Sequence, residues 1–120
     1  MIDHLGLEVS DLPRAARFYD AVLFALGARR LHQGERAIAY GIDSPALWLV
    51  ARGRRPAPDY GHVALRAHGR AAVDAAHAAG LDHGGRCDGP PGARPAYGPH
   101  YYAAYLRDPD GLRLELAAGA

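Results

Sequence analysis

The sequence of 120 residues is short of several residue types, and each shortage excludes a class of protein. It holds a single cysteine, Cys87, so it offers no disulfide framework, and we expect a reducing, cytoplasmic location. It lacks lysine, so all 14 basic residues are arginines, and with 13 acidic residues the net charge is +1. This balance gives no support for binding to nucleic acid or to a membrane surface. The absence of a signal-like leader and of an apolar run near ~20 residues predicts neither secretion nor a membrane span.

What is present fits one compact domain over residues 1–120, with 49% hydrophobic residues. The first part alternates as a strand, repeats apolar residues at helical spacing up to Gly27, and then alternates again in three short runs. The expected order is strand, helix and three strands, at residues 2–9, 12–26, 29–33, 36–41 and 46–51.

The same pattern starts again after a polar, proline-broken connector at residues 53–59. A strand, an alanine-rich helix and three further strands are expected at residues 60–66, 69–80, 82–87, 101–107 and 112–117. The glycine- and proline-rich stretch 84–99 is predicted to form an irregular loop, and Cys87 to be a small buried side chain. The sequence therefore predicts an α+β fold of two diverged βαβββ modules, module one at about 1–52 and module two at about 59–118.

Near the end of the chain, a carboxylate is set among leucines. DPDG at 108–111 is a turn signal, and after it Leu112, Leu114 and Leu116 share one face of a strand while Glu115 points to the other. Taken alone, Glu115 would be interpreted as a solvent-facing glutamate, because glutamate is rarely buried without a partner.

The repeat supplies candidate partners for this carboxylate. His4 and His62 occupy equivalent places on the first strands of the two modules, each on the face turned away from the core. A single strand histidine is more often structural, but two in equivalent positions are harder to explain by packing. If the modules pair side by side into an open trough, His4, His62 and Glu115 would line it. Two imidazoles and one carboxylate form the facial arrangement used by non-haem Fe(II), and Mn, Ni or Zn would also fit.

These stretches resemble the vicinal oxygen chelate superfamily, which includes glyoxalase I, fosfomycin and bleomycin resistance proteins, and extradiol dioxygenases. The resemblance covers nearly the whole chain and is carried by HLGLEVSDL at 4–12, Phe18-Tyr19, HVAL at 62–65 and DPDGLRLE at 108–115. It implies paired modules forming a trough around one divalent metal, which binds two oxygens of the substrate. By position, it implies His4, His62 and Glu115 as the ligands.

The resemblance also favours one branch of the superfamily. Glyoxalases place a fourth ligand, commonly glutamate, where this chain has Trp48, which cannot coordinate a metal. Extradiol dioxygenases share the three remaining positions, and their signature resembles the stretch from Tyr105 to Glu115. This likeness implies a hydrogen-bonding or acid role for Tyr105; their upstream histidine lies further from the tyrosine than His100 does, so His100 is a weaker acid or base candidate.

Three further residues are expected to contact a ligand. Trp48 would form an apolar wall, Arg94 would bind a carboxylate, and Tyr101 is an aromatic residue of the strand. The alternatives for Arg94 and the tyrosines are a solvated loop position and simple packing.

The favoured function is metal-dependent chemistry on a small oxygen-rich molecule, dioxygenase-like before glyoxalase-like, with Fe(II) as the preferred ion. The alternative is a protein of the same fold that binds a drug or metabolite without catalysis. A homodimer is expected in either case, and the connector permits the modules of one trough to come from one chain or from two.

Overall fold

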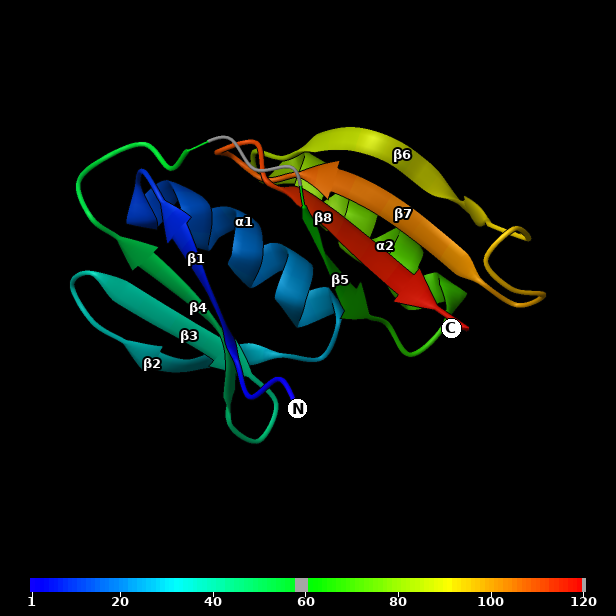
Figure 1. Cartoon of the computed structure of the whole chain (residues 1–120), viewed down its shortest axis with the longest axis horizontal. Coiled ribbons are helices and arrows are strands. Elements are labelled where there is room, and N and C mark those ends of the chain that lie inside the picture. Colours follow the sequence, from blue (N-terminus) through cyan, green and yellow to red (C-terminus); the bar gives the residue numbers. More distant parts are fainter. Residues whose placement is uncertain (58–60, 120) are drawn as a thin grey trace.

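The computed structural model describes residues 1–57 and 61–119 and confirms the α+β architecture of two βαβββ modules. Pro58, Asp59 and Tyr60, which include the end of the predicted connector and the start of the predicted module-two strand, lie outside the described residues. Figure 1 shows the modules side by side, with a helix behind the strands of each sheet in this view. In the described residues, neither helix is long and apolar enough to cross a membrane.

Module one contains β1 (Leu5–Val9), α1 (Leu12–Ala25), β2 (Arg29–Gln33), β3 (Ala37–Gly41) and β4 (Pro45–Ala51). Its sheet has the order β1-β4-β3-β2, with β1 parallel to β4 and the other neighbours antiparallel. α1 begins as expected from the sequence, because the Asp11 side chain accepts a hydrogen bond from the backbone N–H of Arg14 and a proline occupies the first turn.

Module two contains β5 (His62–Arg66), α2 (Arg70–Asp82), β6 (Arg86–Ala93), β7 (Tyr102–Arg107) and β8 (Arg113–Ala118). Its sheet has the order β5-β8-β7-β6 and repeats the pairing of module one, with β5 parallel to β8. In each sheet the first strand of the module lies at an edge, so β1 and β5 each have one side without a strand neighbour among the described residues.

The two modules share one hydrophobic core, which forms where α1 packs against α2. Phe18 and Val22 of α1 are fully buried at this contact. A Cβ on Gly80 of α2 would lie 2.6 Å from Leu106 and 3.1 Å from both of those α1 side chains, so only glycine permits this approach. The helix was expected to end at Gly80, but it continues to Asp82 because this glycine serves close packing and not helix termination.

The turn at 108–112 of module two is hydrogen-bonded to module one. Asp108 is 4% exposed; its Oδ1 accepts hydrogen bonds from the backbone N–H groups of Asp110 and Leu112, and its Oδ2 accepts one from the Tyr19 hydroxyl of α1 at 2.6 Å. Burial raises the pKa of the Asp108 carboxyl, an effect that these hydrogen bonds oppose. The start of β8 is thereby fixed relative to α1.

The predicted loop at 84–99 is largely wrong. Residues 86–93 form β6, an edge strand with irregular register opposite Tyr105, and Cys87 is exposed there instead of buried. Prolines are tolerated on an edge strand because one row of its N–H groups needs no ladder partner, and bulges absorb the glycines.

Candidate metal centre

The sheet of module two packs one face on α2, and the opposite face, called the site face below, carries a histidine paired with a carboxylate. On β8, Leu114 and Leu116 are fully buried in the core, so alternation directs Glu115 to the site face. His62 begins the adjacent parallel strand β5, and its Nε2 lies 3.0 Å from Oε1 of Glu115. Two of the three residues predicted as metal ligands therefore lie together.

Glu115 is 4% exposed and has a polar neighbour at each oxygen. Oε1 faces His62, and Oε2 accepts a hydrogen bond of 2.5 Å from the hydroxyl of Tyr101. This hydrogen bond, together with burial, raises the pKa of Tyr101 to about 12, so the hydroxyl keeps its proton and donates. No arginine forms an ion pair with Glu115 within the described ranges, so the carboxylate is held by neutral groups apart from the imidazole.

Tyr105 lies beside this pair in the middle of the site face. It is buried with Ala103 and Ala117 in a small apolar cluster, and its ring centroid is 6.4 Å from that of His62. Burial raises the pKa of the Tyr105 hydroxyl, and the charge of Glu115 adds to the effect. The hydroxyl therefore keeps its proton at neutral pH, and its expected role as an acid or hydrogen-bond donor stays a prediction.

The candidate residues of module one lie apart from this cluster. His4 precedes β1; its side chain is 54% exposed, and its Nδ1 is 2.6 Å from a carboxylate oxygen of Asp3. Trp48 of β4 is half-buried, pairs with Gly6 in register and lies 5.3 Å from the ring of His32. Within the described part of the chain, no three His, Cys, Asp or Glu side chains are placed to hold one metal ion.

The two remaining predicted residues occupy the segment between β6 and β7. His100 is exposed, and its side chain makes no hydrogen bond or ion pair with any residue that the structure describes. Arg94 donates to the backbone carbonyl of Pro90 at 2.8 Å, and its guanidinium lies 5.8 Å from the ring centroid of Tyr105. Arg94 is therefore near the site face, whereas nothing links His100 to it.

Sequence analysis missed Arg113, whose guanidinium lies 4.1 Å from the ring centroid of Tyr105. Its Nε donates to Asp88 of β6 at 2.8 Å. The available signal was alternation: Arg113 is two residues before Glu115 on one strand, so both point to the same face.

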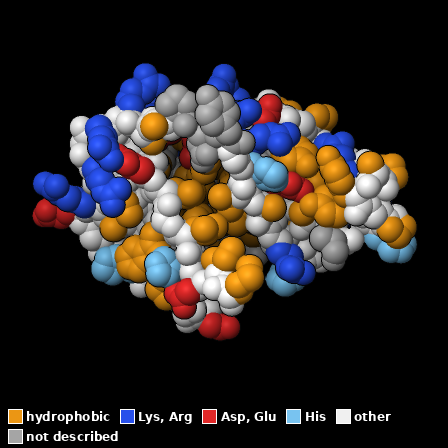
Figure 2. All heavy atoms as spheres, in the orientation of Figure 1, with side chains coloured by type: hydrophobic (Ala, Val, Ile, Leu, Met, Phe, Trp, Pro, Cys, Tyr) orange, Lys and Arg blue, Asp and Glu red, His pale blue; other side chains and the backbone are white. Residues whose placement is uncertain are grey.

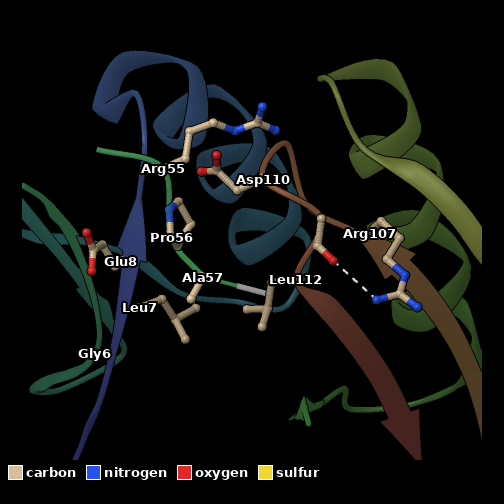
Figure 3. Close-up of a pocket in the computed structure, with 10 residues that line it drawn as sticks. Gly6, Leu7, Glu8, Arg55, Pro56, Ala57, Arg107, Asp110 and Leu112 are labelled. Carbon is tan, nitrogen blue, oxygen red and sulfur yellow. Dashed lines mark hydrogen bonds between the residues drawn. The ribbon is translucent and has the colours of Figure 1, made fainter. Parts of the chain in front are cut away.

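A cavity of about 640 Å³ opens between β1 and the turn that precedes β8, and Arg107 of β7 is among the residues that line it. Figure 3 shows Arg55 and Asp110 at one end of it and Leu7 and Leu112 at the other. In Figure 2 the middle of the molecule is hollowed, with hydrophobic side chains in the hollow and basic side chains along part of its rim. This cavity contains neither histidine nor the Glu115 carboxylate, so the donor atoms that suit a metal belong to the site face instead.

The donor chemistry of the His62–Glu115 pair fits a divalent ion. An imidazole nitrogen and a carboxylate oxygen suit Fe, Mn, Ni and Zn, and 3.0 Å separates two donors that one ion can bridge. Hydrogen bonding of a ligating carboxylate through its second oxygen, as Tyr101 does here, is a usual feature of such sites. If a third protein ligand holds such an ion, it would have to come from outside this cluster.

Comparison with known proteins identifies the family that has this architecture. The profile of the Glyoxalase/Bleomycin resistance protein/Dioxygenase superfamily matches residues 1–116. The chain belongs to this superfamily. It is similar to a glyoxalase/bleomycin resistance protein from Albidiferax ferrireducens T118, with 34% identity, a TM-score of 0.84 and 96% of each chain covered. No curated protein matches the chain.

Two solved structures of lower identity share the fold. Fosfomycin resistance protein FosX from Mesorhizobium loti is 22% identical with a TM-score of 0.74, covering 100% of this chain and 92% of its own. Lactoylglutathione lyase from Agrobacterium tumefaciens is 20% identical with a TM-score of 0.69, covering 99% and 93%. The superfamily thus unites different activities on one scaffold, and the choice among them rests on the site.

Proposed function

We propose that this protein is a divalent-metal-dependent enzyme acting on a small oxygen-rich molecule, dioxygenase-like rather than glyoxalase-like. The observation that carries the proposal is the pairing of His62 with the buried Glu115 on the site face. The dioxygenase preference is supported by Trp48, because β4 offers an indole where glyoxalases place a fourth ligand.

The third ligand is His4 of the partner subunit in a homodimer. His4 is solvent-exposed and absent from the cluster within one chain, while β1 and β5 both have an open edge. Met1, Ile2 and Leu5 expose apolar side chains beside His4, as a surface meant for burial would. A two-fold axis that brings module one of one chain against module two of the other would complete two equivalent sites.

In this mechanism His62, Glu115 and the third histidine hold the ion, and the chain's own residues prepare the reaction. The bound ion supplies Lewis-acid stabilisation of negative charge on vicinal substrate oxygens and, as Fe(II), activation of O₂. The Tyr101 hydroxyl fixes Glu115 so that Oε1 points toward His62. The protonated hydroxyl of Tyr105, which lies beside His62 on the same face, can donate a hydrogen bond from its Oη to a substrate oxygen.

A non-catalytic binding protein of the same fold is the second candidate. It is supported by the small and aromatic residues of the site face, where Ala103 and Ala117 are buried beside Tyr105 and Tyr101. These side chains would accept a flat ligand without a metal.

Anaerobic purification followed by metal analysis tests the first proposal against the second. We expect about one divalent ion per subunit, and O₂ consumption by the Fe(II)-loaded protein when catechol is supplied as a probe of vicinal oxygens. The variant Glu115→Ala, with folding verified by circular dichroism, serves as the matched control and should do neither. A protein that binds no divalent ion, yet binds catechol, would overturn the enzyme proposal in favour of the binder.

A further inference from the structure

Beside the His62–Glu115 pair, the site face carries a row of arginines that the proposed chemistry does not use. In the sheet register His62 pairs with Arg113, Arg113 with Arg107, and Arg107 with Arg86. Paired residues on neighbouring strands point to the same face, so one row of basic side chains crosses β8, β7 and β6 next to the histidine.

The positive charge of this row is only partly neutralised. Asp88 accepts at one oxygen from Nε of Arg113 at 2.8 Å and lies 3.0 Å from Nε of Arg107. The Arg86 side chain is exposed and forms no hydrogen bond or ion pair within the described residues. Three guanidinium groups thus share one carboxylate, and like charges directly opposite one another destabilise a sheet. Such an arrangement implies a further anion.

Arg113 is the member best prepared to receive it. Stacking on the Tyr105 ring and the bond from Nε to Asp88 fix the plane of its guanidinium. Its two terminal nitrogens donate to no residue in the described part of the chain, while Nη1 of Arg107 already donates to the Gly111 carbonyl at 3.2 Å. The Arg113 side chain is about one-third exposed, at 34%, so a small ligand can reach it.

The row also lies at a suitable distance from the donor pair. Adjacent strands are about 4.8 Å apart and residues i and i+2 of a strand about 6.7 Å apart, so Arg113 is anchored within that range of both His62 and Glu115. A fork of parallel N–H donors matches a carboxylate.

We propose that Arg113, supported by Arg107 and Arg86, binds a carboxylate of the substrate, while two adjacent oxygens of the same molecule reach His62 and Glu115. This inference rests on the proposed function and narrows it. The substrate class is a small anionic molecule that carries a carboxylate about one aromatic ring away from a vicinal oxygen pair.

The test compares two probes with identical vicinal hydroxyls, catechol and 3,4-dihydroxybenzoate, by equilibrium titration with the wild-type protein. The protein is measured free of metal and again loaded with Zn(II), which is redox-inert and avoids turnover. We expect the carboxylate probe to bind more tightly by on the order of tenfold or more in both states, since a charge-assisted pair is gained.

Three variants locate the effect. Arg113→Gln should bring the affinity ratio of the two probes close to one. Arg86→Gln, at an exposed side chain, should lower the ratio by a smaller factor. Arg66→Gln is the matched control. It also removes one positive charge from the site face, but Arg66 lies at the end of β5 opposite to His62, so this variant should keep the wild-type affinity ratio.

Equal affinities for the two probes, no binding of 3,4-dihydroxybenzoate, or an unchanged ratio in Arg113→Gln would overturn the anion subsite. The Zn(II) arm tests the proposed function separately. If Zn(II) raises the affinity for neither probe but the preference for the carboxylate probe persists, the anion subsite is supported and chelation of the vicinal oxygens by a metal is contradicted. If Zn(II) tightens both probes equally and no carboxylate preference exists, the opposite conclusion follows.

Discussion

The two modules share one topology but place different chemistry at the same point of their sheets. Two residues after His4, Gly6 pairs with Trp48; two residues after His62, Ala64 pairs with Glu115. The register therefore makes the indole of β4 the counterpart of the carboxylate of β8. The duplicated unit has diverged at this position, and module two pairs its first-strand histidine with a buried carboxylate on the neighbouring strand.

The surroundings of the two histidines differ as strongly as their partners. Both side chains are exposed in similar degree, but His62 contacts the buried carboxylate of Glu115, whereas the polar contact of His4 in the described residues is to its sequence neighbour Asp3. Module two thus brings a histidine and a carboxylate together, which module one does not do across its strands. Under the proposed function, a complete metal site would need both kinds of module.

Removing the carboxylate should have the largest effect. Glu115→Ala should weaken Zn(II) binding by on the order of a hundredfold or more, because a ligand and the site geometry are lost together. Trp48→Ala, the equivalent change in module one, should leave metal affinity unchanged. Calorimetric titration measures both, and equal losses in the two variants would mean that the modules are not chemically distinct.

The hydrogen bond behind Glu115 should have the next largest effect. Tyr101→Phe frees Oε2 of the carboxylate, and loss of such a supporting bond typically weakens metal binding by about 10–100-fold. The neighbouring Tyr102 provides the control, since its hydroxyl donates to Asp74 of α2 on the other side of the sheet. If Tyr102→Phe lowers Zn(II) affinity as much as Tyr101→Phe, a general loss of structure explains the result instead.

The contact between the modules should show in stability rather than in metal binding. Tyr19→Phe leaves the buried Asp108 without its hydroxyl donor and should lower the free energy of unfolding by about 1–3 kcal/mol. In module one, Tyr40→Phe removes a similar bond to the half-exposed Asp20 and should cost less. Urea denaturation gives both values; a larger loss for Tyr40→Phe would contradict the role given to the Asp108 anchor.

The smallest expected effect is a pH dependence in module one. Burial would raise the pKa of Asp20, but hydrogen bonds from Arg30 and Tyr40 outweigh it and hold the pKa below its usual value. A carboxyl with a lowered folded-state pKa stabilises the protein above its unfolded value and loses that contribution as pH falls through the folded value.

Asp20→Asn should therefore destabilise the protein at pH 7 by less than about 1 kcal/mol, since the pair is partly exposed. The difference from wild type should disappear below the unfolded-state pKa, near 3.8, as pH falls further. Melting temperatures measured from pH 7 to pH 2.5 follow this trend. A difference that grows on acidification would show the opposite sign of coupling.

Much of the half-site was predictable because it depends on local periodicity. Alternation on β8 placed Glu115 opposite its leucine neighbours, and the repeat gave His62 the matching face of β5, which the 3.0 Å contact confirms as proximity. The roles of these residues as ligands remain predictions. The resemblance to glyoxalases had singled out Trp48 as standing at a ligand position, and the register shows that it is the counterpart of Glu115.

Other features depend on packing that a single sequence does not encode locally. Gly80 resembled a helix end, but its meaning is set by Leu106 and Phe18 from other elements. β6 could not be predicted from the sequence because its prolines and glycines usually indicate a loop. A strand accommodates them here because it lies at the edge of the sheet. The contacts of Arg113 could not be predicted locally, since its partners Tyr105 and Asp88 lie on different strands.

The position of His4 relative to the His62–Glu115 pair is the central claim, and mixing inactive chains tests it most directly. Chains carrying His4→Ala are unfolded and refolded together with chains carrying Glu115→Ala, and bound Zn(II) is counted. If modules from two chains build each site, each mixed dimer regains one complete site, and random mixing restores about a quarter of wild-type capacity. A mixture of His62→Ala and Glu115→Ala chains, both altered in module two, regains none. No recovery in the first mixture, despite dimers that form and exchange, would contradict a site shared between subunits.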